Sequence, residues 1–208
     1  MQAATSIDLY EYWTRLRGGE TEPLRRDFDP AYLRHSLPAL FMLECGGEND
    51  AVFRLAGTAI CDAFGCELRG LSFENLWRRE DRQGMASLLA RVPRECDPLL
   101  LKADGPQRTG QPMPLEILLV PLRSQTGACD RILGCMTALP SAYRHWDSPI
   151  GSLELKQAAA VRMAANGMPF TLPLGDPRAA APQRLMRRIG HALQSILVPR
   201  PRQRAPFP

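Results

Sequence analysis

The order of strand-like and helix-like segments constrains this chain more than any other feature of its sequence. Two strand-like runs, at 40–44 and 52–55, flank the turn GGEND, and three more, at 99–103, 113–122 and 131–139, follow a helical middle. The connections between the last three runs are polar and contain glycine, which is typical of hairpins. Strands on both sides of a helical middle favour an α+β domain, in which short helices cover one face of an antiparallel sheet. A doubly wound sheet requires strands and helices to alternate throughout, and here they do not.

Alternation along the second strand-like run assigns its side chains to two faces. Successive side chains of a strand point to opposite sides of a sheet. Val52, Arg54 and Ala56 are therefore expected on one face, and Phe53 and Leu55 on the other.

The sequence predicts three short helices between the strands or just before them. The first is expected at 31–37, because the residue before Pro38 disfavours the helical conformation. The second covers 59–64. The third runs from about 81 to 92 and is expected to end at Pro93.

A further helix is expected at the N-terminus, with Ser6 as its cap and Gly18 at its end. Its apolar side chains recur at helical spacing in a single stripe: Leu9, Tyr12, Trp13 and Leu16. This stripe can pack on the chain's own sheet or on a second copy of the chain. Because the stripe is large for a helix outside the core, and aromatic residues dominate interface energetics, we expect these four residues to form a dimer interface.

Charge is distributed unevenly along the chain. From Arg178 onward there are seven arginines and no acidic residue, which leaves 19 of the 26 basic residues, against 22 acidic ones, in the rest. Residues 183–197 are expected to form an amphipathic helix, and the proline-rich last eleven residues are expected to be disordered. Six arginines of this tail are candidates to contact nucleic acid or an anionic membrane surface: Arg184, Arg187, Arg188, Arg200, Arg202 and Arg204.

Several classes of protein are disfavoured by what the sequence does not contain. No run of about 18 apolar residues indicates a transmembrane helix, and the N-terminus does not resemble a secretory signal. The six cysteines form no C-x-x-C pair, so we expect free thiols in a reducing cytoplasm and no metal site. No catalytic motif is evident, and the chain is not expected to be an enzyme.

Four sequence blocks, in this order, resemble a bacterial subfamily of short stand-alone PAS-domain proteins. They are YWTRLRGG at 12–19, DFDPAYLRHSLPALFMLE at 27–44, FRLAGTAICDAFGCELRG at 53–70 and LSFENLW at 71–77. In this subfamily an N-terminal helix with the pattern Trp-x-x-x-Arg-Gly-Gly leads into the PAS core. The resemblance covers about residues 8–140 and does not extend to the basic tail.

The resemblance implies a fold and a domain organisation. The expected fold is a PAS-like five-stranded antiparallel sheet with short helices on one face, an N-terminal flanking helix and a C-terminal basic helical tail. The chain then divides into flanking helices at 1–36, a PAS core at 37–140, an extension of uncertain structure at 141–177, and the tail at 178–208.

The resemblance also implies a function. PAS domains are sensory and interaction modules, so we expect a cytoplasmic module that acts through protein–protein contacts and takes a small ligand in the PAS pocket. The alternative is a binding module whose basic tail engages nucleic acid or an anionic membrane surface. The candidate pocket residues lie on the helices and on the last two strands: Phe64, Leu76, Trp77, Leu88, Leu115, Ile117, Leu119, Leu133 and Cys135.

The two best-known PAS cofactors are not expected. Flavin-binding photosensory PAS domains carry the word Asn-Cys-Arg-Phe-Leu, whereas this chain has Gly65-Cys66-Glu67-Leu68 at the nearest position. Haem-binding PAS domains use a histidine of the middle helices, and residues 58–97 contain no histidine. A small organic ligand or a packed core without a ligand stays open.

Overall fold

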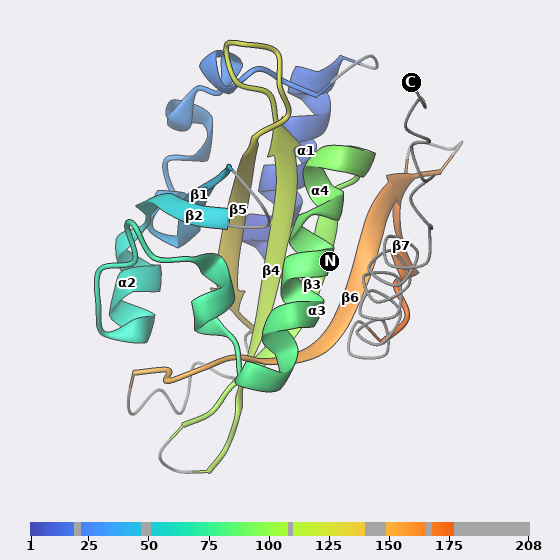
Figure 1. The fold of residues 1–208 in the computed structure, drawn as a ribbon. Coiled ribbons are helices and arrows are strands. Elements are labelled where there is room, and N and C mark those ends of the chain that lie inside the picture. Colours follow the sequence, from blue (N-terminus) through green and yellow to red (C-terminus); the bar gives the residue numbers. More distant parts are fainter. Residues whose placement is uncertain (19–21, 47–50, 108–109, 140–148, 165–167, 177–208) are drawn as a thin grey trace, which may run out of the picture.

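A seven-stranded antiparallel sheet forms the centre of the protein (Figure 1). The computed structural model describes residues 1–18, 22–46, 51–107, 110–139, 149–164 and 168–176. The strand order is β2-β1-β5-β4-β3-β6-β7. The strands are β1 (Leu40–Cys45), β2 (Ala51–Ala56), β3 (Leu99–Gly105), β4 (Met113–Leu122), β5 (Arg131–Ala138), β6 (Glu154–Met163) and β7 (Pro169–Pro173). The first five strands are the predicted ones, and β6 and β7 extend the sheet beyond them.

One face of the sheet, called the inner face from here on, is covered by the short helices of the chain's middle. These are α2 (Thr58–Phe64), the 3-10 turn η4 (Phe73–Leu76), α3 (Arg79–Leu89) and α4 (Arg91–Glu95). A chain of aromatic rings fills the space under α2 and η4: Phe41, Phe53, Phe73 and Trp77 have neighbouring ring centroids 5.5–5.9 Å apart and are fully buried. The predicted α+β architecture, with helices on one face of an antiparallel sheet, is confirmed.

The N-terminal helix α1 (Ala4–Arg17) lies on the opposite, outer face (Figure 1). Gly18 ends it in the left-handed conformation, at φ +60°, as predicted. Ser6 does not cap the helix, because α1 begins two residues earlier. Its side chain is buried, and Ser6 Oγ lies 3.6 Å from Cys135 Sγ.

Prolines shape two segments differently from the prediction. The helix expected at 31–37 is replaced by two 3-10 turns, η2 (Pro30–Leu33) and η3 (Leu37–Ala39), which follow η1 (Arg25–Asp27). The helix expected at 81–92 is divided into α3 and α4, and Pro93 lies inside α4 instead of ending the helix. Pro93 has no N–H to donate to the carbonyl of Leu89, where α3 ends, so one continuous helix is disfavoured.

A β-bulge in β2 overturns the predicted alternation of that strand. Met42 pairs with Leu55 but Leu43 pairs with Phe53, so β2 holds one extra residue, Arg54, at this point. Phe53 still faces the core, whereas Leu55 lies with Met42 on the outer face and is 56% exposed. The prediction that Phe53 and Leu55 share a face is therefore wrong, since an inserted residue reverses every side chain after it.

The segment before β6 is built into the domain. The backbone amides of Ile150 and Leu153 donate to the carbonyls of Ala63 (2.8 Å) and Leu76 (2.6 Å). Four apolar residues of this segment and of β6 belong to the same buried core as the aromatic rings: Ile150, Leu153, Leu155 and Ala158. Residues 151–163, which belong to the extension of uncertain structure, are thus mainly strand.

The basic tail, including the helix predicted at 183–197 and its six candidate arginines, lies outside the described residues. Among the residues that the structure does describe, no helix is long and apolar enough to cross a lipid bilayer.

Candidate functional site

Most of the predicted pocket residues come together on the inner face. Six of them are buried in the main core, with exposures of 0–6%: Leu76, Trp77, Leu88, Leu115, Ile117 and Leu119. Phe64 is half-buried and packs against the same core. The three strand residues alternate along β4, and the helical residues come from α2, η4, its C-terminal flank and α3. That these residues line a ligand pocket stays a prediction.

Leu133 and Cys135 do not belong to this group. Leu133 pairs with Val120 and Cys135 with Leu118, so both side chains share the outer face with residues that α1 covers. Ile132, Gly134 and Met136 of β5 face the inner side instead. The prediction that Leu133 and Cys135 share a face with the β4 candidates is therefore wrong, because a shift of one residue moves a strand's side chains to the other face.

Aromatic packing restricts the space above β5. A Cβ atom added at Gly134 would lie 2.3 Å from the ring of Phe41, so this ring rests directly on the glycine backbone. Phe41 in turn stacks on Phe73, with ring centroids 5.6 Å apart. Cys66, the cysteine nearest to the position at which flavin-binding PAS domains carry their Asn-Cys-Arg-Phe-Leu motif, is exposed on the molecule's surface. The residues of this region therefore do not fit a flavin ring over Gly134 or an adduct with Cys66.

The predicted dimer residues are buried within the chain itself. Leu9, Tyr12 and Trp13 are 0–4% exposed, and Leu16 packs against the same outer cluster. Trp13 Nε1 donates to the carbonyl oxygen of Pro121 at 2.8 Å. Side chains packed on their own sheet leave almost no surface for a second copy. The stripe is thus not available as a dimer interface, and the alternative, packing on the chain's own sheet, is the one observed.

A buried carboxylate holds the start of α1 on the sheet. Glu116, in β4, has no exposed surface and accepts hydrogen bonds from the backbone amides of Gln2 (2.9 and 3.1 Å) and Ala3 (3.0 Å). A negative charge at a helix N-terminus is favoured by the helix dipole. The sequence offered no signal for this contact, because the partners are more than 110 positions apart.

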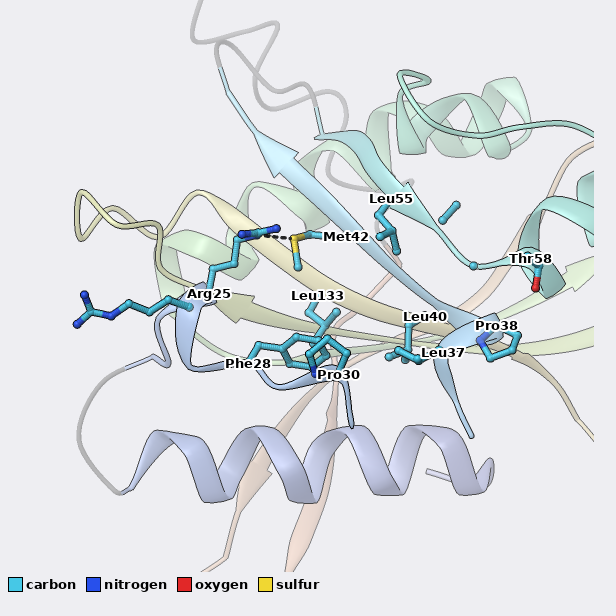
Figure 2. A pocket seen from close by; sticks show the side chains of 13 residues that line it. Arg25, Phe28, Pro30, Leu37, Pro38, Leu40, Met42, Leu55, Thr58 and Leu133 are labelled. Carbon is cyan, nitrogen blue, oxygen red and sulfur yellow. Dashed lines mark hydrogen bonds between the residues drawn. The ribbon is translucent and has the colours of Figure 1, made fainter. Parts of the chain in front are cut away.

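A feature that the sequence did not predict is a groove on the outer face, beside α1 (Figure 2). This outer groove has a volume of about 670 Å³. It is lined by Arg25, Arg26, Phe28, Pro30, Leu37, Pro38, Leu40, Met42, Leu55, Ala56, Gly57, Thr58 and Leu133. One wall is the outer face of β2, β1 and β5, and the other is the linker that contains η1, η2 and η3.

Charged side chains surround the basic end of the outer groove. Glu44 is paired with Arg54, and Glu44 Oε1 lies 2.7 Å from Arg131 Nη2. The hydrogen bond from Arg54, together with the positive charges of both arginines, lowers the pKa of the Glu44 carboxyl. Arg25 Nε donates to Met42 Sδ at 3.3 Å.

The cysteines are free thiols, and several of them are protected by burial. Burial raises the pKa of Cys129 and of Cys135 to about 12, and that of Cys45 to about 11. Such thiols carry little of the thiolate form that reacts or binds metal at neutral pH. Within the described ranges, no group of three or more His, Cys, Asp or Glu side chains is placed to hold a metal ion.

Comparison with known proteins identifies the family. A family model described as PAS domain matches residues 1–137, about two thirds of the chain. The chain belongs to the PAS-domain family. The match includes α1, β1 to β4 and all of β5 except its last residue, and it ends before β6.

Solved structures with similar folds include several light-oxygen-voltage domains. One, studied with a flavin analogue, is 13% identical, with a TM-score of 0.43, over 54% of this chain and 85% of that one. The LOV protein of Rhodobacter sphaeroides is 16% identical, with a TM-score of 0.42, over 52% and 63%. VqmA bound to DPO is 17% identical, with a TM-score of 0.35, over 56% and 61%. No curated protein sequence matches the chain.

Proposed function

We propose that this PAS protein is a cytoplasmic sensory and interaction module that acts by binding another protein. The observation that carries this proposal is the family match over residues 1–137, which takes in the flanking helix as well as the core. The inner-face cluster around Trp77 and Leu88 is the proposed site of any small ligand. A non-enzymatic role is proposed with it, since the sequence has no catalytic motif.

The proposed module does not use a flavin. Two observations support this part of the proposal: the Phe41 ring rests on Gly134, and the Cys66 thiol is exposed. Stoichiometric flavin absorption in the visible spectrum of the purified protein would contradict it.

Native mass spectrometry of the full chain, purified under mild conditions, tests the main proposal. The bare chain has a mass of 23.2 kDa. We expect an additional species whose mass shows a second, different polypeptide bound to the chain. In a separate thermal unfolding experiment, removal of any small ligand should lower the thermal midpoint of the domain. The proposal is contradicted if the chain carries neither a second polypeptide nor a small ligand, whether it is purified with a tag at its N-terminus or at its C-terminus.

The alternative function concerns the basic tail. We propose that the arginines after Arg178 add affinity for a phosphate-bearing surface, either nucleic acid or an anionic membrane. The supporting observation is the charge pattern, seven arginines and no acid over 31 residues. Binding of this kind weakens steeply as salt is added, so a titration against ionic strength separates it from protein contact by the PAS core.

A further inference from the structure

We propose that the outer groove binds an amphipathic carboxylate of the fatty-acid class. In this proposal the carboxylate sits on the guanidinium of Arg25, and the apolar chain lies along β1 and β2 toward Thr58. Figure 2 shows Arg25 and Thr58 at opposite ends of the groove, with apolar side chains between them. The site lies on the opposite face of the sheet from the inner-face cluster, so it does not depend on the function proposed above.

The charge distribution provides the first argument. In the described part of the chain, the cations near this end of the groove pair with neighbouring carboxylates: Arg26 with Asp27, Arg54 with Glu44, and Arg131 with Glu44 and Asp130. Within the same described part, no carboxylate lies within ion-pair distance of Arg25. Its Nε–H donates to Met42 Sδ, and a thioether is a weak acceptor. A ligand carboxylate, which accepts two parallel N–H bonds from a guanidinium, is a much better partner.

The apolar wall provides the second argument. Because of the bulge at Arg54, Leu55 joins Met42 and Leu133 in one row that crosses β2, β1 and β5 on the outer face. Helix α1 packs on β4 and β5, so it leaves the β2 end of this row uncovered. Phe28, from the linker, contributes an aromatic ring to the facing wall.

The size of the groove provides the third argument. Its volume of about 670 Å³ falls within the range of roughly 300–1,000 Å³ that is usual for small-molecule sites. A lining that is apolar apart from charge at one end and a hydroxyl at the other fits a ligand with one charged end. A folded acidic protein surface would need a larger and flatter contact.

Isothermal titration calorimetry of the full chain with decanoate and with decanol tests the proposal, at low salt and below micelle-forming concentrations. The alcohol has the same chain length without the charge, so the ratio of the two dissociation constants isolates the carboxylate contact. We expect decanoate to bind about five- to ten-fold more tightly than decanol, the range for a charge-assisted bond at a partly exposed site.

Two arginine variants form the matched comparison. Arg25→Gln should remove the preference for decanoate while leaving the affinity for decanol unchanged. Arg34→Gln removes another exposed charge from the same linker, outside the groove, and should keep the preference. Leu55→Asn should weaken binding of both ligands, and it should fold because Leu55 is 56% exposed.

Three results would overturn the proposal. They are an absence of saturable decanoate binding to the wild-type protein, equal affinities for decanoate and decanol, and an equal loss of preference in the Arg25 and Arg34 variants. The first result would leave the groove to another occupant, such as an acidic peptide.

Discussion

Individual buried polar groups decide how the outer face of this PAS domain is assembled. The Glu116 carboxylate, Trp13 Nε1 and the Tyr12 hydroxyl each bond to backbone far away in the sequence, and Asp29 N donates to Tyr12 Oη at 2.7 Å. The net contribution of one hydrogen bond to stability is modest, but a buried polar group that loses its hydrogen-bond partner lowers stability by more. A few such hydrogen bonds are therefore enough to fix the position of α1 on the sheet.

Glu116→Ala should lower the free energy of unfolding by about 1–3 kcal/mol, because it leaves the amides of Gln2 and of the buried Ala3 without their acceptor. Glu116→Gln keeps one side-chain carbonyl oxygen and should cost less. Urea unfolding measures both effects. The control is Glu11→Ala, which removes an exposed carboxylate from α1 itself. Equal losses in the Glu116→Ala and Glu11→Ala variants would mean that Glu116 does not hold the helix.

Cys135 should make stability depend on pH above about 9. Burial raises the pKa of its thiol from the ordinary value of 9.0 to about 12. Between these values the unfolded chain releases the proton and the folded chain keeps it. The stability contributed by the protonated thiol is complete below pH 9, and it falls as pH rises toward 12.

The predicted signature is a shallower decline in the Cys135→Ala variant, by as much as about 1.4 kcal/mol for each pH unit. Urea unfolding between pH 8 and about 10.5 measures the slope for wild type and variant, so that other titrating groups cancel. Cys66→Ala, which removes an exposed thiol, is the control. Parallel wild-type and Cys135→Ala curves would contradict the assignment.

Among the elements, β7 shows how this domain protects a sheet edge. Leu174 N donates to Ala158 O, and Ala164 N to Met168 O. In an antiparallel ladder, the N–H and C=O groups of alternate residues point toward the neighbouring strand. Those of Phe170 and Leu172 therefore also point toward β6, and those of residues 169, 171 and 173 point away from it. Two of these three are prolines, so within β7 the amide of Thr171 is the outward donor. An edge with one free N–H is a poor template for another strand.

Replacing both prolines should expose this edge. We expect Pro169→Thr with Pro173→Thr to add two outward donors and to increase self-association, measured as a shift to higher mass in sedimentation velocity. Phe170→Thr alters a residue of the same strand whose backbone N–H and C=O groups point toward β6, so it should leave the mass unchanged. If the double variant stays at the wild-type mass while remaining folded, the prolines do not protect the edge.

The molecule as a whole is larger than the segment that the family match covers. The match ends at residue 137, yet Ile150, Leu153, Leu155 and Ala158 lie in the same core as Trp77. Asp81, at the start of α3, also accepts a hydrogen bond from Leu155 N at 3.0 Å. The folding unit therefore includes β6.

Two truncations should give opposite results. Ending the chain after Leu139 keeps the matched family segment but removes β6 and these four residues of the main core, so we expect loss of cooperative thermal unfolding. Ending it after Gly175 keeps every described strand and should leave the thermal midpoint nearly unchanged, while lowering any affinity for phosphate surfaces. A fall of about ten degrees or more in the second case would correspond to several kcal/mol. That result would place the tail in the core.

Local sequence signals determined the elements themselves. Gly18 and Gly65 end their helices in the left-handed conformation, at φ +60° and +67°, because glycine adopts it without strain. Five strands follow from alternation and turn residues, and together with the four sequence blocks they were enough to indicate a PAS domain. These signals work because helix ends, turns and strand periods depend on residues close together in the chain.

Only the tertiary structure decided which way the elements face and what they cover. Leu55 faces outward because of an inserted residue in β2, and Cys135 faces α1 because of its register with Leu118. The stripe of α1 covers the chain's own sheet because a carboxylate from β4 holds the first amides of the helix in place. Face, register and partner depend on pairing between distant segments, and local periodicity carries no information about that pairing.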